Sequence, residues 1–484
     1  MSIVHDVDLF VGGEWLAAGE RVPATSPATG ELIAEVSQGG RVHVARAVAS
    51  ASTAFDKWSR TNVHERAALL HRLADICLER KEELARALTL DQGKALYAEA
   101  YHEVDDLVGY WRGAAEDAIR LAGDLPSTML TGSRVLVERR PVGVVGVITP
   151  WNWPYTMPAQ IIAPALAVGN AVVWVPAPST TYCSAVLMRC IEAAGLPAGA
   201  VNFVPGPGPV VGDELAGHPD VAAIAFVGST ATGYAVGRRA AGKIQILEMG
   251  NNGPMVVMDD ADLGRAVEGA IVGCFLNAGQ SCAAAERILV HRDVADEFAL
   301  RLTEATHKDV SLGDPFDPET TMGPLNNEGV AAKMEHHVED AIARGATLVH
   351  GGTARSDLPT SLYWAPTILT GVARDSVVAQ EETFGPIAPI IPVDSLEDAI
   401  ALTNALPYGL MASIYTRDYA KGLRYADSVK AAWVNINESS NHWEPQLPFG
   451  GGAGTHSGTG RVGGRYVLES LTQTRTVVLG GLSS

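Results

Sequence analysis

The chain of 484 residues contains only five cysteines, and their spacing matches no metal or redox motif. They are Cys77, Cys183, Cys190, Cys274 and Cys282, with no Cys-x-x-Cys pair among them, which argues against a structural zinc site. We expect no bound metal. Because the number of cysteines is small and odd, at least one thiol is unpaired. This predicts a reducing, cytoplasmic location, where a single thiol can be reactive.

Long apolar runs are also missing from the sequence. No run reaches the ~18 to 20 residues that a transmembrane helix requires, so no membrane contact is expected. The first ten residues contain no Lys or Arg, and Asp6 and Asp8 interrupt their apolar positions, which does not match a signal peptide. These features predict a soluble, globular, cytoplasmic protein.

Positive charge is scarce: 36 Lys and Arg stand against 55 Asp and Glu, a formal net charge of -19. This charge repels phosphate backbones and anionic lipids, and no basic cluster appears, so nucleic acid is not an expected partner.

Glycine is abundant, with 50 residues dispersed along the chain. The surplus fits close backbone approaches to a nucleotide, and it fits an abundance of loops equally well.

Apolar periodicity predicts an α/β fold. Helical spacing covers 42–58, 64–89 and 97–121, and short apolar strands then alternate with helices between residues 142 and 247. The predicted strands of this part are 142–148, 171–175, 201–204, 222–226 and 244–247. Buried strands that alternate with helices are typical of a parallel, doubly wound sheet.

A second alternation of strands and helices runs from residue 254 to residue 405, so we predict two α/β halves that meet near 250–254. Two further strands lie outside both halves. The segment 134–140 alternates polar and apolar residues, and 474–479 forms a strand after a short helix. These two strands could pair with each other.

The segment Asn277-Ala-Gly-Gln-Ser-Cys282 is the first candidate for chemistry. Its small residues would leave a thiolate at Cys282 open to an electrophile, and backbone N–H groups in such a turn could bind an oxyanion. A buried, inert cysteine fits the same stretch equally well.

Two other segments place a polar group at the end of a predicted strand. Glu248 precedes a flexible Gly- and Asn-rich turn and could act as a general base if burial raised its pKa; a solvated loop glutamate is the alternative. Asn152 lies in Ile148-Thr-Pro-Trp-Asn-Trp-Pro154 and could donate its amide to a developing oxyanion, or could merely complete a rigid turn.

Two turns could contact a nucleotide. In Phe226-Val-Gly-Ser-Thr-Ala-Thr-Gly233 a strand leads into a helix whose free N–H groups suit a phosphate, although the spacing matches neither the dinucleotide fingerprint nor a P-loop. An ordinary capped helix start is the alternative. Glu381-Glu-Thr-Phe-Gly-Pro386 could hold a ribose diol or could be a solvated turn.

These motifs, in this order and together with Pro448-Phe-Gly-Gly451, resemble the aldehyde dehydrogenase superfamily over nearly the whole chain. The resemblance implies two doubly wound domains, a Rossmann-like cofactor domain and a catalytic domain, plus a β-strand oligomerisation element. The implied boundaries are 1–124 and 143–250 for the cofactor domain, 251–455 for the catalytic domain, and 125–142 and 456–484 for the oligomerisation element. A homodimer or homotetramer is therefore expected.

The resemblance also implies roles for individual residues. Cys282 would attack an aldehyde, with the Asn152 amide and the Cys282 N–H holding the oxyanion; hydride would pass to NAD, and Glu248 would activate the water that hydrolyses the thioester. The implied cofactor contacts are Thr149, Pro150, Trp151, Trp174, Val175, Pro176, Gly208, Phe226, Gly228, Ser229, Gly250, Glu382 and Phe384. The implied substrate contacts are Trp153, Thr156, Met157, Gln160, Ser281, Trp443 and the rest of the segment 437–447.

Two positions depart from the family pattern. The usual Lys-Pro-x-Glu run is Val175-Pro-Ala-Pro178, which lacks both the carboxylate that would repel a 2′-phosphate and the lysine that would attract one. NAD is therefore expected, with NADP possible. The usual Gly-Gly after the base is Gly250-Asn251; Asn tolerates a left-handed backbone, so the turn should survive.

The segment His442-Trp443-Glu-Pro-Gln resembles relatives that accept aromatic aldehydes, and no Arg pair is visible to bind a second carboxylate. An apolar or aromatic aldehyde is the expected substrate. Two other functions stay open. A CoA-acylating relative would generally lack the base at Glu248, and a non-catalytic relative would lack at least one of Cys282, Asn152 and Glu248.

Overall fold

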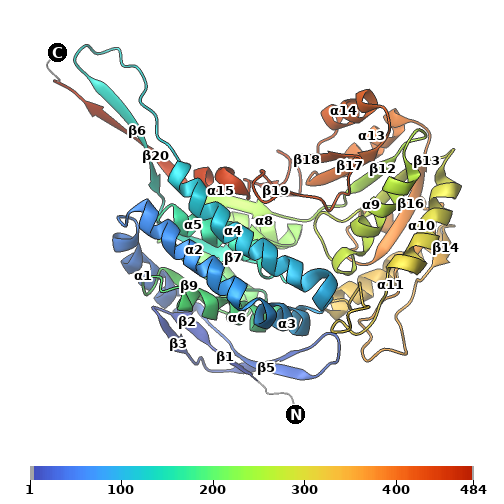
Figure 1. The fold of residues 1–484 in the computed structure, drawn as a ribbon, viewed down its shortest axis with the longest axis horizontal. Helices are drawn as coiled ribbons and strands as arrows, with labels where there is room; N and C mark the ends of the chain where they lie inside the picture. Colours follow the sequence, from blue (N-terminus) through green and yellow to red (C-terminus); the bar gives the residue numbers. More distant parts are fainter. Residues whose placement is uncertain (1–4, 482–484) are drawn as a thin grey trace.

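The computed structural model describes residues 5–481, and within this range it forms two large sheets, a small N-terminal sheet and a two-stranded ribbon (Figure 1). The small sheet has the strand order β1-β5-β4 (His5–Val7, Leu32–Ser37 and Arg21–Thr25). The sequence patterns did not predict these strands, because a strand of three to six residues gives too little periodicity to read.

The first large sheet has the order β19-β11-β10-β7-β8-β9-β2-β3. Its centre is parallel and consists of β7 (Val144–Ile148), β8 (Ala171–Val175), β9 (Val201–Phe203), β10 (Val221–Val227) and β11 (Ile244–Glu248). These strands are almost wholly buried, as in a sheet covered by helices on both faces. Antiparallel strands β2 (Leu9–Val11), β3 (Glu14–Leu16) and β19 (Gly458–Thr459) complete its two edges.

The helices of this half follow the predicted pattern with one correction. The stretch 64–89 is two helices, α2 (Val63–Glu79) and α3 (Lys81–Gln92), and not one. Arg80 interrupts the helix with φ −99° and ψ 21°, although neither Pro nor Gly marks the break. The predicted helix 97–121 begins with a π-helical turn (Leu96–Ala100) and continues as α4 (Tyr101–Arg120). The others are α1 (Arg41–Trp58), α5 (Thr156–Ala167), α6 (Thr181–Ala193), α7 (Gly208–Gly217) and α8 (Thr230–Arg239).

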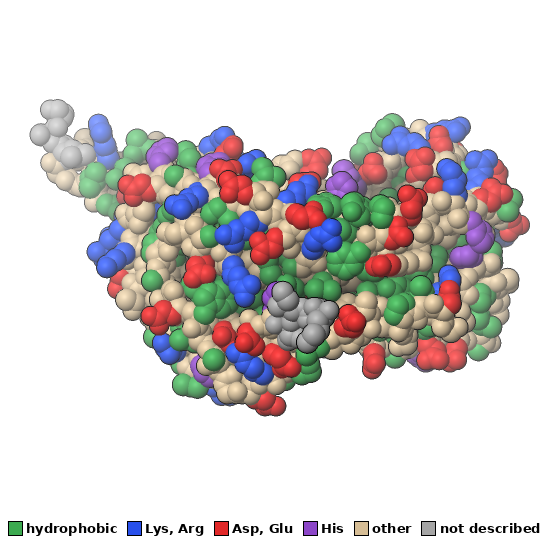
Figure 2. Space-filling view, turned by 60° about the horizontal axis from the view of Figure 1, so that its bottom comes forward, with side chains coloured by type: hydrophobic (Ala, Val, Ile, Leu, Met, Phe, Trp, Pro, Cys, Tyr) green, Lys and Arg blue, Asp and Glu red, His purple; other side chains and the backbone are tan. Residues whose placement is uncertain are grey.

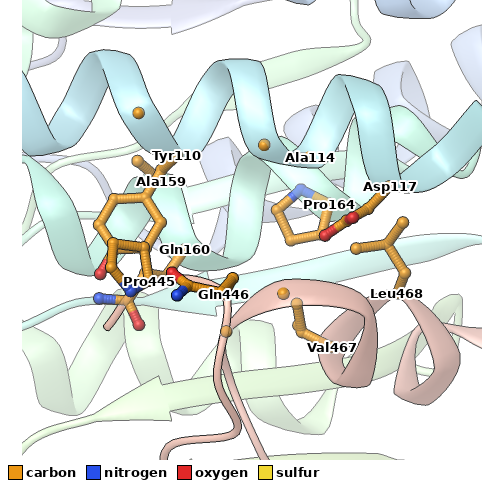
Figure 3. Close-up of a pocket in the computed structure, with 14 residues that line it drawn as sticks. Tyr110, Ala114, Asp117, Ala159, Gln160, Pro164, Pro445, Gln446, Val467 and Leu468 are labelled. Atoms are coloured by element: carbon orange, nitrogen blue, oxygen red, sulfur yellow. The ribbon is translucent and has the colours of Figure 1, made fainter. Parts of the chain in front are cut away.

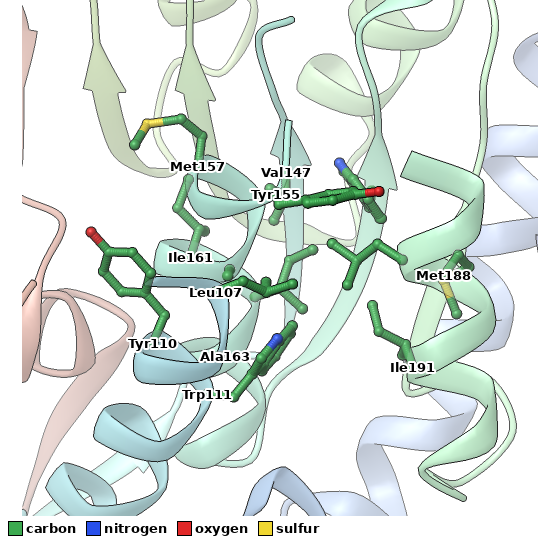
Figure 4. Close-up of a cluster of buried hydrophobic side chains, with 14 of the residues drawn as sticks. Leu107, Tyr110, Trp111, Val147, Tyr155, Met157, Ile161, Ala163, Met188 and Ile191 are labelled. Carbon is green, nitrogen blue, oxygen red and sulfur yellow. The ribbon is translucent and has the colours of Figure 1, made fainter. Parts of the chain in front are cut away.

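The largest core lies where α4, α5 and α6 pack beside β7 (Figure 4). Trp111 of α4 and Tyr155, just before α5, are completely buried there. Burying an aromatic side chain stabilises the fold by roughly 2 to 3 kcal/mol each. This packing fixes the start of α5, the segment that follows the Trp-Asn-Trp turn.

The second large sheet has the order β14-β15-β16-β13-β12-β17-β18 and is parallel except for β14. Its strands are β12 (Pro254–Val257), β13 (Arg287–His291), β14 (Thr347–His350), β15 (Thr367–Thr370), β16 (Ile387–Val393), β17 (Met411–Tyr415) and β18 (Trp433–Ile436). Its helices are α9 (Leu263–Phe275), α10 (Ala295–Asp309), α11 (Glu328–Ala343), α12 (Val377–Gln380), α13 (Leu396–Ala405) and α14 (Tyr419–Ser428). The fold is therefore the predicted α/β class with two doubly wound sheets.

The predicted pairing of the two outlying strands is confirmed. β6 (Arg134–Pro141) and β20 (Thr472–Leu479) form an antiparallel ribbon, with Thr472 opposite Pro141 and Leu479 opposite Arg134. The ribbon projects away from the body, and α15 (Gly464–Ser470) precedes β20 (Figure 1). Strand β19, also from the tail, instead joins the edge of the first sheet.

The surface shows no concentration of positive charge on the face drawn in Figure 2, where Lys and Arg are interspersed with Asp and Glu. Within residues 5–481, no helix combines the length and apolar character needed to cross a membrane.

Candidate active site

Cys282 follows an unusual turn at the end of α9. Asn277, Ala278 and Gly279 have consecutive positive φ values of 53°, 53° and 72°. A Cβ at Gly279 would lie 2.1 Å from the Gly385 carbonyl oxygen, so only glycine fits there. All five cysteines lie in the described part of the chain; four are fully buried, and Cys282 is largely but not fully covered.

Glu248 is the last residue of β11 and is buried. Its Oε1 atom has no hydrogen-bond partner among the described residues, and both Glu248 and Cys282 line one cavity. Burial raises the pKa of Glu248 to about 8; the nearby Cys282 thiol opposes this rise and the Glu382 carboxylate adds to it. A carboxyl group with this pKa can accept a proton near neutral pH.

The Cys282 thiol has a pKa well above its ordinary range, because of burial first and the Glu248 carboxylate second. The resting state is therefore a neutral thiol beside a carboxyl group. Reactive thiols must lose this proton to act as nucleophiles.

Asn152 lies in the turn between β7 and α5, and its side chain is buried. One N–H of its amide donates to the Gln280 carbonyl oxygen at 3.0 Å, which ties this turn to the Cys282 loop. A carboxamide has two N–H groups, so the second is available to a bound group in the same cavity.

The cavity that contains these three residues has a volume of about 320 Å³ and lies between the two large sheets. Seven of the predicted cofactor contacts line it: Pro150, Trp151, Gly228, Ser229, Gly250, Glu382 and Phe384. Ser229 caps α8 by accepting a hydrogen bond from the Thr232 N–H at 3.4 Å. Because Ser229 also lines the cavity, the N-terminus of that helix lies at the cavity. Free N–H groups at such a terminus suit a phosphate.

The other six predicted cofactor contacts, Thr149, Trp174, Val175, Pro176, Gly208 and Phe226, do not line this cavity. The Trp174 indole is fully buried and donates to Thr149 Oγ1 at 2.9 Å. The Phe226 ring lies beneath Gly228, where a Cβ would approach it to 2.7 Å. Trp174 and Phe226 therefore pack in the core and do not line the cavity themselves.

The predicted aldehyde contacts come together beside the thiol. Trp153, Met157, Gln160, Ser281 and Trp443 line a second, enclosed cavity next to Cys282, together with Ala283 and Phe449. This inner cavity measures only about 10 Å³, room for roughly one water molecule. In this structure the inner cavity is therefore smaller than an aromatic ring.

A larger outer cavity of about 270 Å³ shares Gln160 with the inner one (Figure 3). It lies between α4, α5 and the chain from Pro445 to Leu468. Trp443 lines the inner space and donates from Nε1 to the hydroxyl of Tyr110, which lines the outer one, at 3.4 Å. Asp117 lines the outer space, and no Lys or Arg occurs among the described residues that line either space.

Comparison with known proteins agrees with this geometry. The model of the aldehyde dehydrogenase family matches residues 15–477. The chain belongs to the aldehyde dehydrogenase family. The enzyme is thus an oxidoreductase that acts on an aldehyde group with NAD or NADP.

Individual relatives are similar over nearly their whole length. The 3-sulfolactaldehyde dehydrogenase of Pseudomonas putida is 39% identical, covering 98% of this chain and 97% of the relative. The crystal structure of succinate-semialdehyde dehydrogenase from Burkholderia pseudomallei has a TM-score of 0.95 at 37% identity and covers 98% of each chain. Betaine aldehyde dehydrogenase from Staphylococcus aureus in complex with NAD+ has a TM-score of 0.93 at 33% identity, covering 97% of this chain and 94% of that one.

The sequence patterns missed one wall of the large cavity of this enzyme. The start of α11 contributes Gly329, Val330 and Lys333, and Asn327 precedes it. The Lys333 ammonium donates to the Glu382 carbonyl oxygen at 3.2 Å. Nothing in the local sequence of α11 distinguishes this lysine from one on any solvated helix, so only the fold could reveal it.

The backbone of the turn after Glu248 differs from the left-handed conformation considered for Gly250-Asn251. Neither Gly250 nor Asn251 has a positive φ, so the turn does not depend on the tolerance of Asn for a left-handed backbone. Instead, a Cβ at Gly250 would lie 3.1 Å from the Glu382 carboxylate, and the Asn251 N–H donates to the same carboxylate at 2.8 Å. The turn thus holds Glu382 in place.

Thr156 and most of the segment 437–447 do not line the predicted aldehyde tunnel. Thr156 is buried, and its N–H donates to Glu103 at 3.3 Å. Residues 437–439, 441 and 442 line a different cavity, together with Arg265 and Tyr415. Within the segment 437–447, only Trp443, Pro445 and Gln446 line the inner or outer space.

Proposed function

We propose that the enzyme oxidises an aldehyde to the carboxylic acid through a thiohemiacetal and then a thioester at Cys282. The observation that carries this proposal is the convergence of Cys282, Glu248 and Asn152 on one cavity. They supply a nucleophile, a base and an oxyanion donor, the set that acyl transfer to water requires.

Each residue has a defined task in this sequence of steps. The Cys282 thiol gives its proton to the Glu248 carboxylate or to solvent, Sγ adds to the carbonyl carbon, and the developing oxyanion accepts hydrogen bonds from Asn152 Nδ2 and from the Cys282 backbone N–H. The nicotinamide of the cofactor supplies the hydride acceptor. Glu248 then takes a proton from water, which attacks the thioester and releases the acid and the thiol.

The cavity fits a nicotinamide dinucleotide. Gly228 and Ser229 at the start of α8 would hold the pyrophosphate, and Glu382 would accept hydrogen bonds from a ribose diol. Phe384 packs edge-on against Trp151, with ring centroids 5.5 Å apart, and would flank the nicotinamide. We favour NAD over NADP, because Val175 and Pro178 offer no cation for a 2′-phosphate.

The lining of the inner space supports an apolar or aromatic aldehyde. Trp153 and Trp443 meet edge-on with centroids 5.7 Å apart, and Met157 and Phe449 add apolar surface. The substrates named for the sulfolactaldehyde and succinate-semialdehyde relatives carry an anionic group. Burying such a group without a cation costs several kcal/mol.

A panel of aldehydes tested with NAD and NADP in parallel would test the substrate and the cofactor together. We expect kcat/KM for phenylacetaldehyde or benzaldehyde to exceed that for succinate semialdehyde at least tenfold, with NAD preferred. A preference for succinate semialdehyde would contradict the assigned substrate class and leave the chemistry at Cys282 intact.

Trp443 should control the size of aldehyde that the enzyme accepts. Replacing Trp443 with Ala opens the inner space to the outer one, so kcat/KM for bulky aromatic aldehydes should rise and that for acetaldehyde should fall about tenfold. Trp443→Phe is the matched control, because it keeps one aromatic ring while removing the hydrogen bond to Tyr110 and the second ring of the indole. An unchanged substrate profile in Trp443→Ala would place the aldehyde elsewhere.

Two competing functions make different predictions. A CoA-acylating enzyme would release its thioester only to coenzyme A, whereas Glu248 beside Cys282 supports hydrolysis by water. Absence of turnover without coenzyme A would overturn the hydrolytic assignment. A non-catalytic relative is disfavoured because Cys282, Asn152 and Glu248 are all present and share one cavity.

We also propose the domain limits and assembly stated from the resemblance. The change from β11 to β12 supports a boundary between 250 and 251. The projecting β6–β20 ribbon supports a homodimer or homotetramer, because a two-stranded ribbon is marginally stable on its own. Light scattering that shows a monomer would contradict this assembly.

A further inference from the structure

A buried ion pair lies behind the Asn152 turn. Lys94, just after α3, places its ammonium 2.5 Å from a carboxylate oxygen of Glu103 in α4, and both side chains are completely inaccessible to solvent. The sequence patterns gave no reason to single out either residue. A buried ion pair is weak evidence for stability, because apolar replacements of similar volume are often equally stable.

The contacts of this pair concentrate on one turn. The Lys94 ammonium also donates to the Asn152 backbone carbonyl at 3.1 Å and lies 3.8 Å from the centre of the Trp153 ring. The second Glu103 oxygen accepts hydrogen bonds from the N–H groups of Tyr155 and Thr156 at 3.0 and 3.3 Å. Lys94 therefore contacts the turn at Asn152 and Trp153, and Glu103 contacts the two residues that follow.

Asn277 links the same carbonyl to the Cys282 loop. Its side-chain amide donates to the Asn152 carbonyl at 3.0 Å and to the Gln280 carbonyl at 3.2 Å. Its own Oδ1 accepts from Gln92 at 3.0 Å, and its N–H donates to Glu99. These bonds hold a left-handed backbone that costs about 1 to 2 kcal/mol without support.

We propose that Lys94 and Asn277 are positioning residues that set the Asn152 amide against the Cys282 loop. This inference rests on the proposed role of Asn152 as oxyanion donor. Two donors on one carbonyl fix the plane of the peptide that follows Asn152, and with it the direction of the side chain. A displacement of about 1 Å in such a donor can cost 10²-fold in rate.

The test is the neutral double variant Lys94→Met with Glu103→Gln, which removes both charges of the pair together. We expect a folded enzyme that binds NAD and whose Cys282 reacts with iodoacetamide within threefold of the normal rate. The single-turnover rate of NADH formation should fall at least 10²-fold, with KM changed less than kcat. Adding Asn152→Ala to this variant should cost less than threefold more, because both changes remove the same interaction.

The matched control is Lys81→Met with Asp105→Asn. This pair also joins α3 to α4, at 2.6 Å, but is partly exposed and makes no contact with the Asn152 turn, so NADH formation should be unaffected. An equal loss in the control would assign the effect to helix packing and overturn the proposal.

Other outcomes separate this inference from the proposed function. A normal single-turnover rate in the Lys94 and Glu103 variant, with a slow Asn152→Ala enzyme, would refute the positioning role alone. A normal rate in Asn152→Ala would refute both. If the double variant does not fold, Asn277→Gly tests the same carbonyl, because glycine keeps the left-handed backbone and removes the amide donors together with the acceptor of the Gln92 amide. A normal rate in this variant would also overturn the proposal.

Discussion

Replacing Cys282 with Ala should abolish aldehyde-dependent NADH formation, with a loss of at least about 10⁴-fold in kcat. The thiol forms the bond on which both hydride transfer and hydrolysis depend, and no other cysteine among the described residues lines the cavity. Steady-state absorbance of NADH measures the loss, and NAD binding should persist.

The matched control for this prediction is Cys274→Ala. Cys274 lies eight residues earlier, is buried, and contacts only the Ala285 carbonyl through its thiol. This variant should keep near-normal kcat. If Cys282→Ala retained activity, or if both variants lost it equally, the nucleophile would have to be assigned elsewhere.

Replacing Glu248 with Gln should stop the reaction after the first turnover. We expect a burst of about one NADH per site, followed by a steady state 10² to 10⁴ times slower, because hydrolysis of the thioester needs the base. The burst should slow less than the steady state, since a thiol can also lose its proton to solvent. Stopped-flow absorbance resolves the two phases, and an unchanged steady state would contradict the role of Glu248.

The pH profile tests the same residue without a change in sequence. Burial disfavours the charged carboxylate and raises the pKa of Glu248 to about 8, so the base is mostly protonated at pH 7 and mostly ionised at pH 9. Turnover limited by hydrolysis should therefore rise about tenfold between pH 7 and pH 9 and then level off. Glu248→Gln should lose this rise, whereas the Cys274 control should keep it.

The sequence predicted those catalytic groups that lie within short, continuous motifs. Cys282, Glu248 and Asn152 each lie in a short motif of unusual composition at the end of an element, and the order of the motifs identified the family. Strand pairing of β6 with β20 was also predictable, because both lie outside the alternation of strands and helices.

Other features depend on contacts between distant segments. Glu103 and Lys333 lie on helices whose local pattern is ordinary, and Lys94 lies just after such a helix; only packing brings these residues to the turn or the cavity. The break at Arg80 is not marked by Pro or Gly, so the apolar periodicity predicted one helix where the structure has two. The burial of Trp174 and Phe226 in the core also depends on packing and could not be predicted from their local sequence.

The close approach of Gly279 to Gly385 has a consequence for how the two substrates affect each other. The loop that carries the thiol touches the loop that carries Glu382 and Phe384, and glycine at 279 leaves no side chain to act as a spacer. A shift of one loop when its ligand arrives must therefore displace the other. Thermodynamic reciprocity then requires that an aldehyde and a dinucleotide change each other's affinity by the same factor. The backbone contact between Gly279 and Gly385 therefore connects the loop of the thiol to the loop of Glu382 and Phe384 within the second α/β half.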